Sequence, residues 1–170
     1  MGNYYLHEKI GTVSMVIEPD AYTSAIIQAS DNDTPIPIGA YGGYDHVLFI
    51  LQTGDITGGG IGAGVLGVMY SCDANGSNAT AGTDVWAASD AYFPAVTSDG
   101  ENEVYLLDFD IAGKGLPIST NDGNGAYLFI GSTVAVAGAV DGAVLAIPYG
   151  ANRLPSTNEN TVTYIGETST

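Results

Sequence analysis

The segment 61–71 contains glycines in the G-x-G-x-x-G frame of a dinucleotide-binding turn, and it follows the apolar run 46–53. These glycines are Gly62, Gly64 and Gly67. In such a turn the glycines lead from a strand directly into a helix, whose first N–H groups bind the pyrophosphate. Here residues 65–71 continue with the period-two alternation of a strand. We therefore expect a glycine-rich strand and no nucleotide site, with a flexible hairpin loop at 58–60 before it.

Asp108 and Asp110 are the residues best spaced for acid–base chemistry. They stand two apart in the run 103–111, so in a strand they share one face. A carboxylate pair of this kind serves glycoside hydrolysis. The alternative is a solvated or subunit-facing strand surface. The sequence places no second candidate acid, no activated nucleophile and no catalytic histidine-plus-carboxylate spacing, so we predict that the protein is not an enzyme.

Several loops are rich in side-chain oxygens that could hold calcium. They are Asp31 with Asp33, Asp73 with Asn75 and Asn78, Asp99 with Glu101 and Glu103, and Asn121 with Asp122 and Asn124. None fits the twelve-residue calcium loop, and Asp and Asn are common in turns for their own backbone hydrogen bonds. Cys72 is the single cysteine, which excludes a multi-cysteine metal site. We expect His46, inside an apolar run, to be structural, and we expect no metal and no cofactor.

The pattern of apolar residues predicts strands throughout the chain. The expected strands are 10–17, 23–29, 46–53, 61–71, 103–111, 126–137 and 143–148, with 85–93 open between strand and short helix. The first should stop at Glu18-Pro19-Asp20, and Asp141-Gly142 should form the tight turn of a hairpin. We expect 46–53 to be a central strand buried on both faces.

The run 103–111 is the clearest one-sided strand. Its apolar face is Tyr105, Leu107, Phe109 and Ile111, and its half-polar face is Val104, Leu106, Asp108 and Asp110. About seven to nine strands, separated by turn residues and with no sustained helical period, predict an all-β fold. We expect an antiparallel β-sandwich or jelly roll over 10–150, with an N-terminal arm at 1–9 and a C-terminal arm at 151–170.

The charge balance excludes several partners. Nineteen acidic residues against three basic ones give 170 residues a net charge of −16, which repels nucleic acid and anionic membranes alike. The longest apolar stretch, 126–149, is interrupted by polar residues and does not predict a spanning helix. The opening residues carry no signal-peptide pattern, so we expect no secretion by that route. A single domain suits this length.

Tyrosine is abundant, with eleven copies against four phenylalanines and one tryptophan. Tyrosine is favoured in interfaces where one end of the ring is apolar and the other is wet. Several fall in the expected loops or arms, and we predict an interface there. The candidate interface residues are Tyr4, Tyr5, Tyr41, Tyr44, Tyr149 and Tyr164, together with Arg153.

Four segments resemble the small all-β head decoration and cement proteins of tailed bacteriophages. They are YDHVLFILQTGDI (44–56), GVMYSCDANGSNATAGTDV (67–85), EVYLLDFDIAG (103–113) and VLAIPYGANRLP (144–155). The resemblance spans about residues 10–155. It implies a non-enzymatic protein that is made in the host cytoplasm and then sits on the capsid surface of the virion, where it bridges major capsid protein subunits as a homo-oligomer, by analogy a trimer.

Two alternatives stay open at this point. One is another phage structural role, in a tail or fibre. The other is a carbohydrate-binding or adhesin-like β-sandwich, in which Trp86 beside the loop 73–84 is the best candidate sugar site.

Overall fold

The chain forms antiparallel β-structure in the computed structural model. The structure describes residues 10, 13–23, 26–27, 31, 33, 36–37, 44–71, 92–97, 102–111, 127–132 and 134–150. Within these residues the strands are β1 (Ser14–Thr23), β2 (Ile36–Pro37), β3 (His46–Gly60), β4 (Leu66–Ser71), β5 (Val104–Asp110), β6 (Tyr127–Ser132) and β7 (Ala137–Tyr149).

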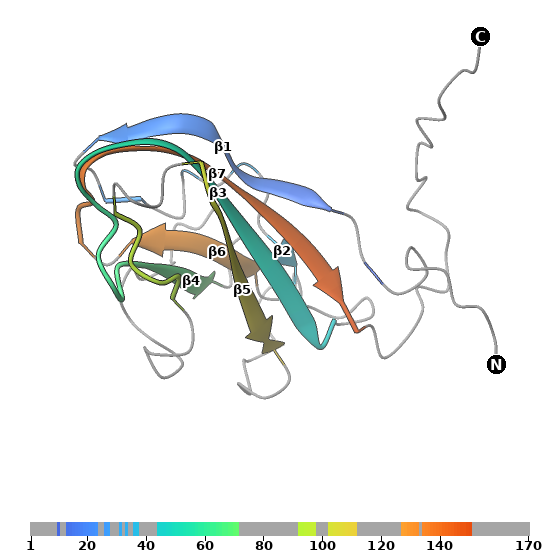
Figure 1. Ribbon diagram of the computed structural model, residues 1–170. Coiled ribbons are helices and arrows are strands. Elements are labelled where there is room, and N and C mark those ends of the chain that lie inside the picture. Colours follow the sequence, from blue (N-terminus) through green and yellow to red (C-terminus); the bar gives the residue numbers. More distant parts are fainter. Residues whose placement is uncertain are drawn as a thin grey trace, which may run out of the picture.

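The strands make two sheets. The first has four strands in the order β1-β7-β3-β5, and the second has three in the order β2-β6-β4. Every pairing between these strands is antiparallel. Figure 1 shows the two sheets as separate layers, with β3 and β7 long and strongly curved. The all-β, antiparallel prediction is therefore confirmed, and β3 is an interior strand of its sheet, as expected for 46–53.

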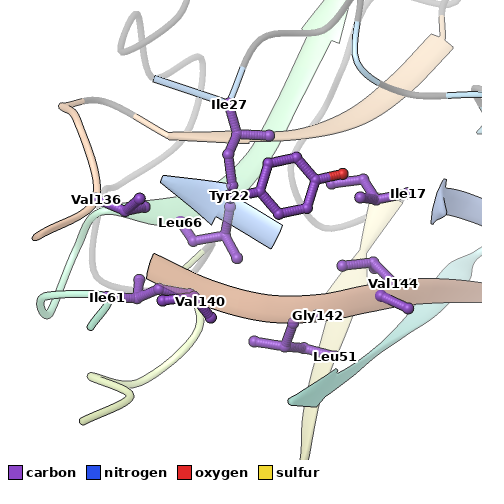
Figure 2. A pocket seen from close by; sticks show the side chains of 11 residues that line it. Ile17, Tyr22, Ile27, Leu51, Ile61, Leu66, Val136, Val140, Gly142 and Val144 are labelled. Atoms are coloured by element: carbon purple, nitrogen blue, oxygen red, sulfur yellow. The ribbon is translucent and has the colours of Figure 1, made fainter. Parts of the chain in front are cut away.

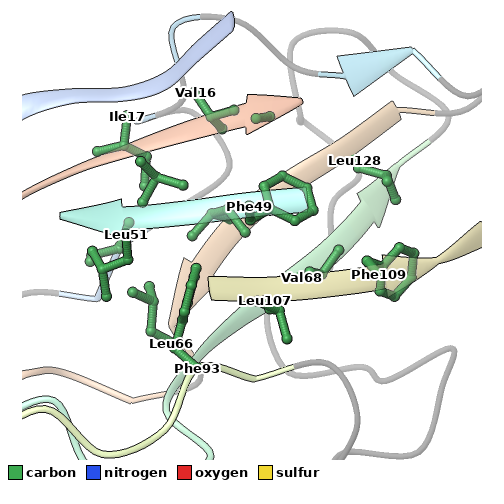
Figure 3. Packing of buried hydrophobic residues seen from close by; sticks show 14 of the residues in the cluster. Val16, Ile17, Phe49, Leu51, Leu66, Val68, Phe93, Leu107, Phe109 and Leu128 are labelled. Atoms are coloured by element: carbon green, nitrogen blue, oxygen red, sulfur yellow. The ribbon is translucent and has the colours of Figure 1, made fainter. Parts of the chain in front are cut away.

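The core lies between the two layers. The side chains of β3 alternate between fully buried and partly exposed along its first half, and those of β5 alternate between buried and exposed. The buried side contributes Phe49 and Phe109, which are 0% exposed, and the second sheet contributes Leu66 and Leu128. Figure 3 shows these side chains packed together with Phe93. The predicted faces of 103–111 are confirmed, whereas β3 is fully buried on one face only.

The glycines 58–60 do not form the flexible loop that we expected. They belong to β3, which continues past Gly54 and pairs with β7 as far as Gly60. Gly58 lies opposite Gly138, and both have positive φ, 76° and 103°. A Cβ on Gly138 would collide with the Thr57 carbonyl. The two backbones approach too closely for side chains, which is why glycine stands on both strands.

The expected hairpin turn at Asp141-Gly142 is also wrong. Both residues lie inside β7, paired with β1, and the φ of Gly142 is not positive. The predicted strand 126–137 instead ends at Ser132 in the second sheet, while β7 runs in the first. Pairing along the whole length of β3 extends β7 through a dipeptide that would favour a turn in isolation.

Pro19 does not end the first strand. β1 runs from Ser14 to Thr23, and its register against β7 shifts between Ile17 and Asp20. Pro19 falls in this shift on the outermost strand of the sheet, where the missing N–H breaks no regular ladder. The earlier shift, between Met15 and Ile17, lets Val16 and Ile17 both be buried.

Other predicted segments are shorter than expected or only partly described. The strand expected at 61–71 begins at Leu66, after a turn at 63–65. Gly67, the last glycine of the frame, lies inside β4, so the frame leads into a strand, as expected. Of 23–29, Ile26 and Ile27 lie outside the strands. Most of 85–93 and both expected arms lie outside the described residues.

Candidate functional site

The candidate site is the face of the four-stranded sheet that points away from the second sheet, called here the outer face. One row of apolar side chains crosses all four strands of this face. In strand order it consists of Met15, Leu145, Ile50 and Leu106, each paired with the next. Ile147 and Leu48 lie opposite each other in the adjacent row, and Val104 lies opposite Gln52 on the other side.

The apolar side chains of the outer face are exposed on the two edge strands, whereas Leu145 and Ile50 between them are half-buried. Leu106 is 61% exposed, Val104 59% and Met15 38%, and Val13 just before β1 is 49% exposed. The second sheet differs, because Met69 and Phe129 on its far side are 7% and 1% exposed. Clustered apolar side chains that stay in contact with water mark interaction sites on soluble proteins. The fold thus leaves one sheet face available for a partner.

A polar cluster closes one end of the outer face. The imidazole of His46 stacks on the ring of Tyr149, with centroids 5.0 Å apart and planes 20° apart. The Tyr149 hydroxyl donates a hydrogen bond of 2.7 Å to Asp108 Oδ2. This hydrogen bond, with desolvation and the charges of Asp108 and Asp110, raises the pKa of Tyr149 to about 12. Stacking on His46 and the hydrogen bond to Asp108 therefore fix the orientation of the Tyr149 ring.

His46 and Asp108 form an ion pair only when the imidazole is protonated. His46 Nδ1 lies 3.4 Å from Asp108 Oδ1, and it lacks the alignment of a hydrogen bond. Asp108 and Asp110 do share a face, as their spacing predicted, and both are exposed. Neither carboxylate lines the two hollows described below. In this arrangement Asp108 orients Tyr149 and adds negative charge to the rim of the apolar row.

A small cavity lies between the sheets, and Figure 2 shows the side chains that line it. Its volume is about 20 Å³, and it is lined mainly by apolar side chains such as Ile27 and Leu66. A space of this size is comparable to one water molecule, and water needs polar partners that this lining does not supply. Tyr22 borders the cavity, and burial, followed by the nearby Asp20, raises its pKa to about 12. The cavity is a gap in packing, without room for a ligand.

A wider open hollow, of about 450 Å³, adjoins the outer face. It lies where β1 and β3 shift register, beside Pro19 and Thr53. Gln52 and Ala143 belong both to this hollow and to the row next to Leu106. The hollow therefore enlarges the surface on which a partner could bind beside the outer face.

Two of the predicted interface tyrosines lie within the described residues. Tyr149 is the last residue of β7 and lies on the outer face, whereas Tyr44, just before β3, is half-buried against the core. The others lie outside the described residues: Tyr4, Tyr5, Tyr41, Tyr164 and Arg153. Sequence reasoning missed Leu106 and Ile50 as site residues. The sequence did contain a signal for this face, because the run 46–53 is apolar on both sides and places Leu48 and Ile50 on the side away from the core.

Asp31 and Asp33, which form one of the acidic loops, lie within the described residues. Asp33 accepts a hydrogen bond of 3.1 Å from the Glu18 N–H and donates its own N–H to the Val16 carbonyl at 2.8 Å. Among the described residues, no group of three or more His, Cys, Asp and Glu side chains is arranged to hold a metal ion. The same part of the chain contains no helix long and apolar enough to cross a membrane.

Comparison of the chain with protein-family models, with curated proteins and with solved structures gave no match.

Proposed function

We propose that the chain is a structural protein of a tailed-bacteriophage virion, a decoration or cement protein that binds the outer surface of the assembled capsid. In this role it bridges neighbouring major capsid protein subunits and performs no catalysis. The proposal includes a homo-oligomer, by analogy a trimer, and a jelly-roll connection of the strands. Its location is the capsid surface, after synthesis in the host cytoplasm.

The apolar row on the outer face, exposed at Met15 and Leu106, is the observation that carries the proposal. Three of the four segments that resemble decoration proteins include all of β5 and parts of β3 and β7, and these strands contribute most of this face. Burying a side chain such as Leu106 at an interface contributes roughly 1.5 kcal/mol, so several together suffice for specific docking. Many copies on one particle then act together, which makes modest individual contacts adequate.

The test is binding of the purified protein to expanded capsids that lack decoration protein, followed by measurement of the temperature at which the capsids break. We expect the protein to sediment with capsids and to raise that temperature. Leu106→Lys should weaken binding about tenfold or more, because it places a charge in the apolar row. Val134→Lys is the matched control, since Val134 is 53% exposed but lies outside the four-stranded sheet.

Three results would count against the proposal. The first is a protein that leaves expanded capsids unbound and unchanged. The second is equal loss of binding in the Leu106→Lys and Val134→Lys variants. The third is retention on a glycan array without capsid binding, which would favour the carbohydrate-binding alternative.

A further inference from the structure

The edge of the four-stranded sheet at β5 offers a second mode of contact beside the outer face. We infer that β5 accepts an extended segment of the partner protein as an added strand, and that this segment combines apolar residues with Lys or Arg. The inference rests on the proposed function, because it names how the capsid protein engages the same site. It differs in its chemistry, since backbone hydrogen bonds carry the contact.

The register of β5 against β3 determines which backbone groups face outward. The Ile111 N–H donates to the Asp45 carbonyl at 2.8 Å, and the Thr53 N–H donates to the Glu103 carbonyl at 3.0 Å. In an antiparallel pair, residues that exchange hydrogen bonds alternate with residues that do not. The odd-numbered residues of β5 therefore bond to β3. The N–H and C=O groups of Val104, Leu106 and Asp108 point away from it.

Within the part of the chain that the structure describes, the other three sheet edges are interrupted or bridged, whereas no segment pairs with the outer edge of β5. β1 carries Pro19 and two register shifts, and β2 is two residues long and contains Pro37. β4 is bridged at Gly67 by Tyr92. β5 is seven residues long and contains no proline, and its pairing with β3 runs without a shift. Proteins usually block long regular edges because such edges pair with other chains, so an edge left regular is a candidate for pairing with a partner.

The side chains at this edge indicate the composition of the added strand. Val104 and Leu106 are the two most exposed large apolar residues of the described chain. A partner residue opposite Leu106 would extend the apolar row onto a fifth strand. Farther along β5, the exposed carboxylates of Asp108 and Asp110 favour a cation. The partner segment should therefore be apolar opposite the first half of β5 and basic opposite the second half.

The charge of the chain favours a different protein over a second copy. With three basic residues against nineteen acidic ones, most carboxylates have no cation within the chain to pair with. Pairing β5 with β5 of a second copy would bring together two molecules that each carry −16. A basic segment from another protein removes this repulsion and supplies the missing cations.

The test separates backbone pairing from side-chain contact at one position. Leu106→Pro removes an N–H that points away from β3, so it leaves the β3–β5 ladder intact. Leu106→Thr is the matched control, because it also removes the leucine but keeps the N–H and suits a strand. We expect Leu106→Pro to bind expanded capsids about tenfold more weakly than Leu106→Thr, since edge hydrogen bonds are lost and the ring obstructs the seam.

A second measurement does not depend on any variant. The amides of Val104, Leu106 and Asp108 should exchange quickly with deuterium in the free wild-type protein and become protected when capsids are bound. If capsids bind but these amides stay unprotected, or if the two variants bind equally, the added strand is refuted while the proposed function stands.

A synthetic peptide tests the β5 edge even if the protein does not bind capsids. The blocked peptide KTVTVTK presents valines and terminal lysines to the edge, and ETVTVTE is its charge-reversed control. If wild-type protein ignores capsids but binds KTVTVTK better than ETVTVTE, and Leu106→Pro loses this binding, the edge site stands without the capsid role. No binding of either peptide, or protected β5 amides in a homodimer without partner, would overturn the inference.

Discussion

Adjacent leucines on β5 give the sharpest test of how the sheet is oriented. Leu107 is 9% exposed and lies opposite Phe49 in the core, whereas Leu106 is 61% exposed on the outer face. Both can be changed to alanine, so the chemistry removed is the same and only the environment differs. The comparison therefore isolates burial as the cause of any difference in the free energy of unfolding.

The expected costs follow from these environments. Leu→Ala in a core costs about 2–5 kcal/mol, less where neighbours can move into the space. Since β5 is the last strand of its sheet, we expect Leu107→Ala to cost about 2–3 kcal/mol. A surface change is usually within about 0.5 kcal/mol, which is our expectation for Leu106→Ala. The larger loss is a substantial part of a net stability of about 5–15 kcal/mol.

The assay is urea unfolding followed by circular dichroism, with the slope against urea concentration compared between the variants. Equal slopes would show that the two substitutions leave the surface exposed on unfolding unchanged, so that the midpoints report stability. Equal costs, or a larger cost for Leu106→Ala than for Leu107→Ala, would refute the orientation of β5 and with it the outer face. The same Leu106→Ala protein should also bind capsids more weakly, which separates a loss of partner contact from a loss of stability.

Two further predictions concern single polar contacts. Asp108→Asn should lower the pKa of Tyr149 from about 12 toward the usual 10. The measurement is an ultraviolet titration of the tyrosines, in which the Tyr149 signal is the one that Tyr149→Phe removes. An unchanged titration in Asp108→Asn would contradict the hydrogen bond. Because folding raises this pKa, the protonated Tyr149 contributes to the free energy of unfolding below about pH 10, and this contribution is lost as the pH rises to about 12. In Asp108→Asn the free energy of unfolding should fall less over this pH range. Ser132→Ala removes the buried acceptor of the Ile27 N–H, 2.6 Å away, and should cost about 1–3 kcal/mol in urea unfolding; a change near zero would contradict that role.

The sequence predicted those parts of the fold that depend on local alternation. The two faces of β5 follow from side chains that alternate between apolar and half-polar, because a strand places successive residues on opposite sides. The interior position of β3 follows from its apolar run. The strand expected to continue through Gly67 is β4, since residues 65–71 keep the alternation of a strand.

The missed features depend on pairing between distant residues. Gly58 reads as a loop residue until Gly138, eighty positions away, is placed opposite it. Asp141-Gly142 reads as a turn until β3 extends β7 past it. For the same reason the outer face was not predicted as a site. The sequence shows that Ile50 and Leu106 are apolar, but only the register shows that they lie side by side with no layer of described strands above them.

The net charge opposes pairing of two copies through their outer faces. Two copies that approach through their outer faces bring together −16 on each side, and the acids Asp108 and Asp110 lie on that face. Repulsion between like charges is screened by salt, with a Debye length of about 8 Å at physiological ionic strength. Attraction to a basic partner is screened in the same way. Added salt should therefore weaken docking to such a partner while it promotes pairing between copies, and these opposite responses distinguish a protein built to bind another surface from one built to bind itself.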